Sequence, residues 1–196
     1  MLTIWQREAL IAPKHKGGIC CIVAPRRSGK TYLIKEALRS SKVLVCVPSR
    51  LGISYIKSVI QDIPSGETLF PDPTLISDVY DIDNAINASV EKRGEPPRLV
   101  YIEEPSFLAE DFFMGFLNIR KSFPSCIFIF IGTASTDTRN GFNQFLFKIH
   151  KGEIEGAITK WPQSPFISQQ DNLKEAVGEH AFKVEFEAKI PVIDYI

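Results

Sequence analysis

The amino-acid sequence predicts an α/β fold in which helices flank a mainly parallel central sheet. Two observations lead to this prediction. Short, nearly continuous apolar runs alternate along the chain with segments of helical periodicity, as expected when connecting helices cover both faces of each strand. The chain has 196 residues, of which 44% are hydrophobic and 23% charged, which suits one globular domain with a full apolar core. A single domain is therefore expected over residues 1–196.

The elements follow one another without a repeat or a long linker. Four apolar runs are the predicted strands: Ile19 to Ala24, Val43 to Val47, Arg98 to Glu103 and Cys126 to Gly132. The helical periodicity predicts helices at Ile4 to Ile11, Lys30 to Arg39, Ile53 to Gln61, Ile82 to Lys92, Glu110 to Ser122, Gly141 to His150 and Glu179 to Lys189. Three prolines and one glycine between Ile63 and Pro73 predict a surface loop.

The formal net charge is zero, so the chain as a whole is not a strongly basic nucleic-acid binder. The charge is nevertheless uneven. Between Arg26 and Lys57 there are eight basic residues and one acid, Glu36, whereas the segment from Lys151 to Ile196 has five lysines and eight acids. Such an asymmetry is expected either from a solvated face or from a surface that faces phosphates.

Targeting signals, disulfides and metal clusters are not expected. No run approaches the roughly 18 apolar residues that span a bilayer, and the N-terminus does not resemble a signal peptide, so an intracellular protein without a membrane partner is predicted. The four cysteines lie in apolar runs and lack zinc-ligand spacing, which predicts buried, reduced thiols. The three histidines fit no metal-ligand spacing.

A phosphate-binding loop is predicted between the first strand and the next helix. Its residues are Ala24, Pro25, Arg26, Arg27, Ser28, Gly29, Lys30 and Thr31, in the strand–loop–helix context that a Walker A motif requires. Gly29 allows successive backbone amides to point at phosphates, next to the positive end of the helix dipole. Lys30 is expected to reach the β- and γ-phosphates of ATP, and the Thr31 hydroxyl to bind Mg²⁺. Ala24 replaces the first glycine of the common motif, which a strand-ending residue with negative φ tolerates.

Two carboxylates end the third predicted strand. Glu103 and Glu104 follow the apolar run Leu-Val-Tyr-Ile, the arrangement of a Walker B motif with an adjacent catalytic acid. Glu103 is expected to contribute to the Mg²⁺ shell through a water, and Glu104 to orient and polarise the attacking water. Taken alone, such a pair is often only the acidic start of a helix. Its position about 70 residues after the Walker A motif favours the catalytic interpretation.

The last predicted strand is followed by small residues, most of them with hydroxyls: Thr133, Ala134, Ser135 and Thr136. Ligands of open α/β folds bind at the carboxyl edge of the sheet, so hydroxyls there can sense a γ-phosphate and pass its loss to a moving helix. A simple Ser/Thr turn is the competing interpretation. The order of the three motifs favours a coupling role for Thr133, Ala134 and Ser135.

These motifs together resemble the large terminase subunits of tailed phages and herpesviruses. APRRSGKT resembles the terminase form of Walker A, and VYIEEPSFL the Walker B motif with its catalytic glutamate. The herpesvirus-type coupling region is similar to the segment MGFLNIRKSFPSCIFIFIGTAST, which is followed by FNQFLFKIHKG. The segment that closes the family's ATPase domain is similar to HAFKVEFEAKI. IWQREAL places Gln6 about where the family has its adenine-reading glutamine. The resemblance covers nearly the whole chain in the family's order.

The resemblance implies an ATP-hydrolysing, Mg²⁺-dependent motor that packages double-stranded DNA into a capsid. Arg26 would act in cis on the γ-phosphate, and the subunits would form a homo-oligomeric ring, a pentamer, on a portal at the site of viral assembly in the host cytoplasm or nucleus. The family's RNase H-like nuclease domain has no room after Lys189, so no nuclease activity is expected from this chain. The chain would be a fragment or exon product, or would act with a separate nuclease or a small terminase subunit.

Other interpretations of the same motifs differ in what they require. A helicase-like, nucleic-acid-stimulated NTPase shares these motifs, but the helicase superfamilies need a second motor domain, for which no second motif set exists in these 196 residues. A non-motor nucleotide-binding module does not need a positioned acid such as Glu104. A small-molecule kinase needs a lid-like arginine cluster after the third strand, and the sequence has none there.

Overall fold

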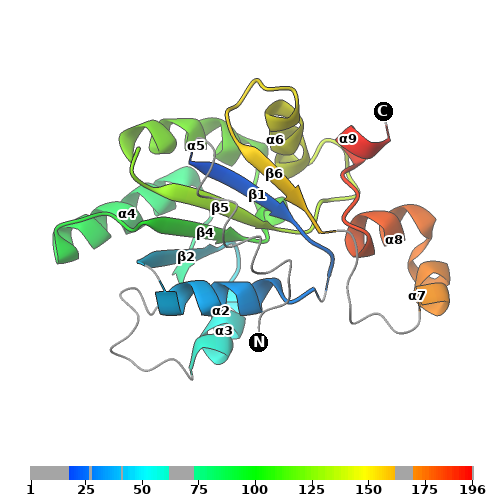
Figure 1. Ribbon diagram of the computed structural model, residues 1–196, viewed down its shortest axis with the longest axis horizontal. Helices are drawn as coiled ribbons and strands as arrows, with labels where there is room; N and C mark the ends of the chain where they lie inside the picture. The colour runs from blue at the N-terminus through cyan, green and yellow to red at the C-terminus, as the bar shows by residue number, and fades with distance from the viewer. Residues whose placement is uncertain (1–17, 27, 41, 62–72, 162–169, 196) are drawn as a thin grey trace.

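The computed structural model describes residues 18–26, 28–40, 42–61, 73–161 and 170–195. Its centre is a six-stranded sheet of order β3-β2-β4-β5-β1-β6, in which all neighbouring strands are parallel (Figure 1). The strands are β1 (Ile19–Val23), β2 (Val43–Val47), β3 (Thr74–Leu75), β4 (Leu99–Glu103), β5 (Ile127–Gly132) and β6 (Ala157–Lys160). The predicted α/β fold with a parallel central sheet is confirmed.

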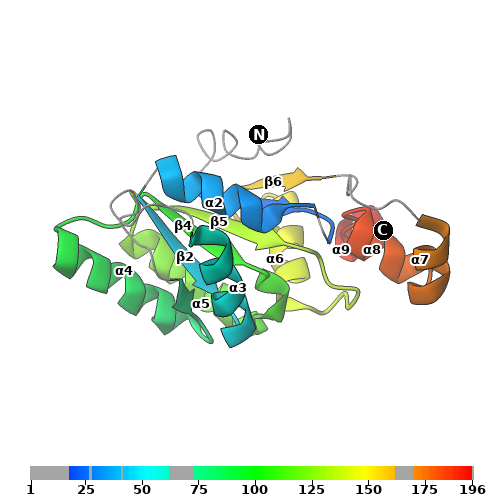
Figure 2. The same cartoon turned by 90° about the horizontal axis from the view of Figure 1, so that it is seen from below.

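Helices cover both faces of the sheet. They are α2 (Lys30–Ser40), α3 (Arg50–Ile60), α4 (Val79–Arg93), α5 (Glu110–Ser122), α6 (Gly141–His150), α7 (Gln170–Val177), α8 (Glu179–Phe186) and α9 (Pro191–Asp194), with a 3-10 turn, η2 (Pro105–Phe107). One core cluster joins the sheet to α2 and α3, and another joins it to α4, α5 and α6. The last three helices gather beyond the carboxyl end of β1 (Figures 1 and 2).

The two cores follow from the alternation of side chains along each strand. In β5, Phe128 and Phe130 point to the α4–α6 side, whereas Ile129 and Ile131 point to the α2–α3 side. Phe116 of α5 is fully buried and makes edge-to-face contacts with Phe128 and Phe130, with ring centroids 4.9 Å apart in both pairs. Continuous apolar runs were therefore a sound indicator of strands covered on both faces.

Two edge strands were not predicted. β3 has two residues, and β6, with the sequence Ala-Ile-Thr-Lys, is only partly buried. Edge strands with one neighbour need no continuous apolar run, so the criterion that found the central strands misses them. The central strands differ from their predicted bounds by one residue at most, since β1 ends at Val23, β4 begins at Leu99 and β5 at Ile127.

Several helices begin or end at other residues than predicted, because local capping interactions determine their ends. Both α3 and α4 begin three residues before their predicted starts, because Ser49 accepts a hydrogen bond from the Gly52 amide and Asp78 forms a capping box with Asp81. α8 ends at Phe186 instead of Lys189, since Ala188 has a left-handed φ of 53°. α7 was not predicted. The predicted helix from Ile4 to Ile11, and the predicted loop up to residue 72, lie outside the described residues.

The cysteines and the membrane prediction can be compared directly with the structure. All four cysteines are buried and unpaired, as predicted, and burial raises the pKa of the Cys20 thiol to about 11. None of the helices in the described segments has both the length and the apolar character needed to cross a membrane.

Candidate nucleotide-binding site

The loop after β1 leads directly into the first turn of α2, as the Walker A pattern predicts. Its first residue, Ala24, is buried and donates its amide hydrogen to the Gly132 carbonyl oxygen over 2.9 Å, which ties the loop to the end of β5. Gly29 has a φ of +87°, a conformation that favours glycine, so this position explains the glycine of the motif. Lys30 is the first residue of α2. Arg27 lies outside the described residues.

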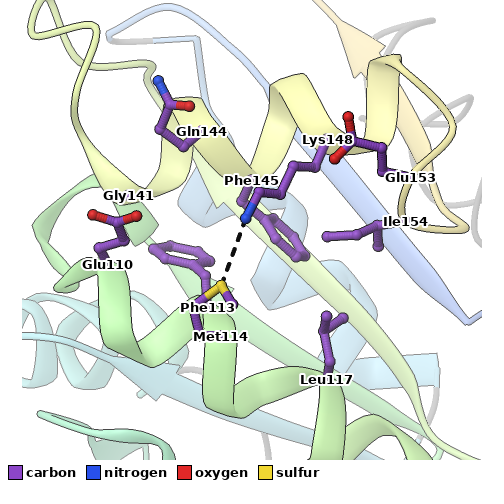
Figure 3. A pocket seen from close by; sticks show the side chains of 10 residues that line it. All are labelled: Glu110, Phe113, Met114, Leu117, Gly141, Gln144, Phe145, Lys148, Glu153 and Ile154. Atoms are coloured by element: carbon purple, nitrogen blue, oxygen red, sulfur yellow. Dashed lines mark hydrogen bonds between the residues drawn. The ribbon is translucent and has the colours of Figure 1, made fainter.

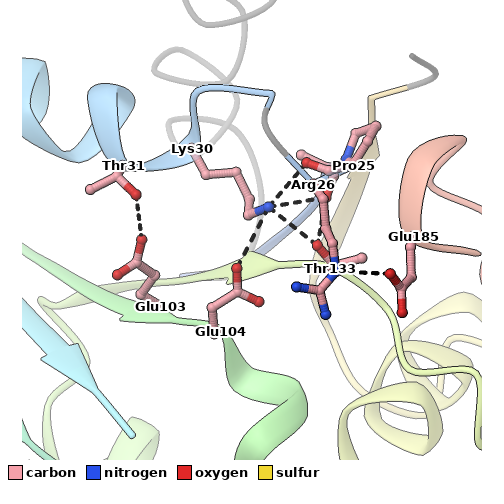
Figure 4. A network of polar contacts seen from close by, with 9 residues as sticks. Pro25, Arg26, Lys30, Thr31, Glu103, Glu104, Thr133 and Glu185 are labelled. Carbon is pink, nitrogen blue, oxygen red and sulfur yellow. Dashed lines mark hydrogen bonds and ion pairs between the residues drawn. The ribbon is translucent and has the colours of Figure 1, made fainter. Parts of the chain in front are cut away.

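Lys30 occupies the centre of the site (Figure 4). Its side chain is only 7% exposed, and its ammonium donates to the carbonyl oxygen of Pro25 at 3.0 Å and to the Thr133 hydroxyl at 3.2 Å. A carboxylate oxygen of Glu104 lies 3.6 Å away. Burial lowers the pKa of Lys30, while the charges of Glu104 and Glu103 act in the opposite direction. A further anionic oxygen would therefore stabilise this ammonium.

Thr31 and Glu103 form an oxygen pair next to Lys30. The Thr31 hydroxyl donates to a carboxylate oxygen of Glu103 over 2.8 Å. Glu103 is 6% exposed, and burial raises its pKa against the lowering effect of the hydrogen bond from Thr31. Oxygen ligands of this kind suit Mg²⁺, which usually takes one or two protein ligands and completes its shell with substrate phosphates and water. Within the described segments no group of three or more His, Cys, Asp or Glu side chains forms a larger metal cluster.

Glu104 has a strained backbone. Its φ of 46° and ψ of 54° lie in the left-handed region, which costs a non-glycine residue about 1–3 kcal/mol. Its amide donates to the Ile131 carbonyl over 2.9 Å, and Pro105 follows in η2. Gly132 makes this turn possible, because a Cβ there would lie 2.6 Å from Cδ of Pro105. The turn brings the Glu104 carboxylate beside Lys30. Residues with a strained backbone often lie at functional sites.

The third motif contacts the phosphate-binding loop directly. The buried Thr133 hydroxyl donates to the carbonyl oxygen of Ala24 over 3.2 Å and accepts from Lys30. Ala134 is buried as well, whereas Thr136 is exposed. The motif thus joins the end of β5 to the loop after β1, the contact that a coupling role needs.

Sequence reasoning missed Asn143, a fully buried residue in the first turn of α6. Its amide oxygen accepts from the Ser135 amide at 3.2 Å, and its amide nitrogen donates to the carbonyl oxygens of Ser135 at 2.7 Å and Asp137 at 2.8 Å. One side chain therefore fixes the segment after Thr133 to α6. An asparagine inside an apolar helical pattern was the available signal, because a buried amide needs such partners.

Arg26 pairs with Glu185 of α8, a second residue that sequence reasoning missed. Nε of Arg26 lies 2.9 Å from Oε2 of Glu185, and the Arg26 amide donates to the Glu185 carbonyl oxygen over 2.7 Å (Figure 4). The charge of Arg26 is among those that lower the pKa of Lys30, so the guanidinium lies within electrostatic reach of the site. No local pattern in the sequence connects two residues so far apart.

The described residues of the predicted site come together at the carboxyl edge of the sheet. They are Ala24, Pro25, Arg26, Ser28, Gly29, Lys30, Thr31, Glu103, Glu104, Thr133, Ala134 and Ser135, all at or just after the ends of β1, β4 and β5. Gln6, like Arg27, is outside the described residues. Ser28 Oγ is buried without a hydrogen-bond partner among the described residues, so the loop has an unsatisfied polar atom that a phosphate oxygen would satisfy. The side chains present therefore fit a magnesium–nucleotide complex.

A separate groove lies between α5 and α6 (Figure 3). Its lining is Glu110, Phe113, Met114, Leu117, Gly141, Gln144, Phe145, Lys148, Glu153 and Ile154, none of which belongs to the predicted site. The Lys148 ammonium contacts Met114 Sδ at 3.6 Å across it. The groove is thus distinct from the predicted nucleotide site.

Comparison with known proteins identifies the fold. No protein-family model and no curated protein matches the sequence. The structure is similar to the large terminase of a thermophilic bacteriophage, with a TM-score of 0.63 and 12% sequence identity, over 97% of this chain and 54% of that chain. It is also similar to the HK97 bacteriophage large terminase, with a TM-score of 0.55 and 13% identity, over 95% of this chain and 43% of that chain. The chain spans about half the length of these two proteins. The chain therefore has the fold of the phage large terminases.

Proposed function

We propose that this chain is an ATP-hydrolysing motor domain that powers the translocation of double-stranded viral DNA into a capsid. The observation that carries the proposal is the meeting of Lys30 and the strained Glu104 at the carboxyl edge of the sheet, 3.6 Å apart. A buried cation binds phosphate, and a carboxylate beside it can position water. The similarity to phage large terminases supports packaging as the work that hydrolysis drives.

Nucleotide binding would use the second half of the phosphate-binding loop. The amides of Ala24 and Arg26 are engaged by Gly132 and Glu185, and Pro25 has no amide hydrogen. The phosphate contacts would therefore come from the segment that begins at Arg27, with Ser28 Oγ and the Lys30 ammonium. Lys30 would exchange its hydrogen bond to a neutral carbonyl oxygen for contacts with the anionic β- and γ-phosphate oxygens. Gln6 is the proposed adenine-reading residue.

Thr31 and Glu103 would hold Mg²⁺, which when bound would neutralise charge on the phosphate oxygens. Their hydrogen bond of 2.8 Å already places both oxygens side by side. Burial raises the pKa of Glu103, and a bound cation beside it would act in the opposite direction and favour the carboxylate.

Glu104 would act on the attacking water. Once a γ-phosphate competes for the Lys30 ammonium, the carboxylate is released to accept a hydrogen bond from water. The water oxygen then forms a bond to the γ-phosphorus, the bond to the ADP oxygen breaks, and the water proton passes to Glu104. Arg26 would stabilise the charge that develops on the γ-phosphoryl oxygens.

Thr133, Ala134 and Ser135 would couple hydrolysis to movement. Thr133 contacts Lys30 and the loop, and Ser135 is fastened to α6 by Asn143. Loss of the γ-phosphate changes the partners of Lys30, and this contact chain transmits the change to α6.

The proposed partners follow the family resemblance. They are double-stranded DNA, further copies of this chain in a ring of five on a portal, and a separate nuclease or small terminase subunit, at the site of viral assembly in the host cytoplasm or nucleus. The zero net charge agrees with a motor that must release DNA in each cycle, because permanent phosphate contacts slow release.

The test is steady-state ATP turnover of the purified chain and of Glu104→Gln, with and without DNA. Turnover in the parent chain that is lost in Glu104→Gln, although ATP still binds, is the expected result. Stimulation by duplex DNA beyond that by single strands is expected from a packaging motor. Stimulation by single strands alone would contradict packaging and favour a helicase-like enzyme. ATP binding without turnover, with or without DNA, would contradict the hydrolase assignment.

A further inference from the structure

Arg26 and Glu185 connect the phosphate-binding loop to α8, although they lie far apart in the sequence. Two contacts join them. The Arg26 amide donates to the Glu185 carbonyl oxygen over 2.7 Å, and Nε of the same arginine lies 2.9 Å from Glu185 Oε2. The first contact sets the backbone of the loop, and the second sets the direction of the guanidinium.

The position of Glu185 is determined by its neighbours in α8. Val184 and Phe186, on either side of it, are both buried, and Val184 belongs to the main core cluster. The rings of Phe182 and Phe186 stack with centroids 5.4 Å apart. These apolar contacts and the backbone hydrogen bond hold α8 in place. The backbone of Glu185 therefore has a fixed position relative to the loop, and its side chain reaches Arg26 from there.

The contact through Nε leaves the arginine able to bind phosphate. A guanidinium has five N–H donors, and the Glu185 carboxylate uses the one on Nε. Within the part of the chain that the structure describes, no residue pairs with the four donors on the terminal nitrogens, which can therefore bind a pair of phosphate oxygens, the geometry in which arginine binds phosphate best. In Figure 4 these terminal nitrogens point away from Glu185, toward the side of the site on which Glu104 lies.

Folding stability alone does not account for this ion pair. The Arg26 and Glu185 side chains are 57% and 30% exposed, and ion pairs with that degree of exposure contribute little to the free energy of unfolding. What the pair does restrict is the direction of a long, flexible side chain.

We infer that Glu185 is a positioning residue for Arg26, holding its guanidinium toward the γ-phosphate of bound ATP and making α8 part of the nucleotide site. The inference rests on the proposed function, since it assumes that the loop binds a nucleoside triphosphate. It predicts that Glu185 affects the γ-phosphate and leaves the binding of a diphosphate unchanged.

The test measures the affinities of the full chain for ADP and for the slowly hydrolysed analogue ATPγS, by calorimetry in the presence of Mg²⁺. We expect Glu185→Ala to lower the preference for ATPγS over ADP by about tenfold, the scale of one charge-assisted hydrogen bond. Glu185→Gln, which keeps an oxygen acceptor without the charge, should lose less. Glu187→Ala is the matched control, because Glu187 follows in the same segment and does not contact Arg26 in the described structure.

A double-mutant cycle separates positioning from a structural role. Arg26→Ala should lower the ATPγS preference by itself, and adding Glu185→Ala to it should cause no further loss. Additive losses, or a fall in ADP affinity in Glu185→Ala, would overturn the inference. An unchanged ATPγS preference in Glu185→Ala would overturn it too, while leaving the proposed function intact. Failure of the parent chain to bind either nucleotide would overturn both.

Discussion

Gly132 shows how the absence of a side chain determines where a carboxylate lies. The Glu104–Pro105 turn packs onto this glycine, and the approach is close enough that a Cβ on Gly132 would lie 2.6 Å from Pro105 Cδ and 3.2 Å from Glu104 Cα. Proline is rigid and the other contact is backbone, so neither can move without a large cost in energy. At the scale of single residues, the left-handed conformation of Glu104 is thus tied to a glycine on the neighbouring strand.

Gly132→Ala should therefore lower the turnover number far more than nucleotide affinity. The added methyl group displaces Glu104, while Lys30 and the phosphate-binding loop keep their contacts. A loss of about 10²-fold in kcat is expected, on the scale of a misplaced catalytic group. Turnover and ADP affinity, measured on the same preparations, check this.

Gly156→Ala is the control for that experiment. A Cβ at Gly156 would meet its nearest atoms at 3.4 Å, an ordinary contact, and this glycine has no positive φ. Equal turnover in the two variants would show that Gly132 does not position Glu104.

Lys30 is expected to supply the main charged contact with the phosphates, alongside Ser28 Oγ and the loop amides. Lys30→Ala should reduce nucleotide binding to below detection, because the only buried ammonium among the described site residues is removed. Calorimetric titration with ADP and ATPγS measures the loss. Lys121→Ala, an exposed lysine near the end of α5, should bind as the parent chain does. Retained affinity in Lys30→Ala would mean that the nucleotide binds elsewhere.

At the scale of elements, Asn143 links the end of β5 to the start of α6. Its fully buried side chain satisfies the Ser135 amide and the carbonyl oxygens of Ser135 and Asp137. The predicted helix from Gly141 to His150 agrees with α6, so the periodicity of the sequence located the element correctly. The role of its one buried amide became visible only with the β5 segment beside it.

Asn143→Ala should lower the free energy of unfolding by about 3 kcal/mol, because it removes the hydrogen bonds that a buried side chain makes with the backbone of Ser135 and Asp137. Urea denaturation monitored by circular dichroism measures the change. The neighbouring Gln144 is the control. Its side chain donates to the Thr138 carbonyl oxygen at an exposed site, so Gln144→Ala should change the free energy of unfolding by less than about 1 kcal/mol. If both variants lowered the free energy of unfolding by similar amounts, the hydrogen bonds of the buried Asn143 side chain would not have the stabilising role proposed here.

At the scale of the whole molecule, consecutive residues determined much of the architecture. Short apolar runs predicted the four central strands because strands covered on both faces must be apolar throughout. The phosphate-binding loop was predicted from residues that follow one another directly: a strand, a loop with a glycine, then Lys30 and Thr31. The Walker A motif can be recognised in this way because it joins adjacent elements. The apolar residues directly before Glu103 and Glu104 predicted that this acidic pair lies at the end of a strand.

The tertiary structure alone decided which distant residues complete the site. Gly132 meets Pro105 because the neighbouring parallel strands β4 and β5 end at one edge of the sheet. Glu185 meets Arg26 because α8 packs beside the phosphate-binding loop, and Asn143 meets Ser135 because α6 folds back onto the segment after β5. Such pairs leave no local periodicity in a single sequence, and the edge strands β3 and β6 leave little. The sequence thus determined the motifs, whose chemistry depends on adjacent residues, whereas packing between distant segments decided how their side chains are held.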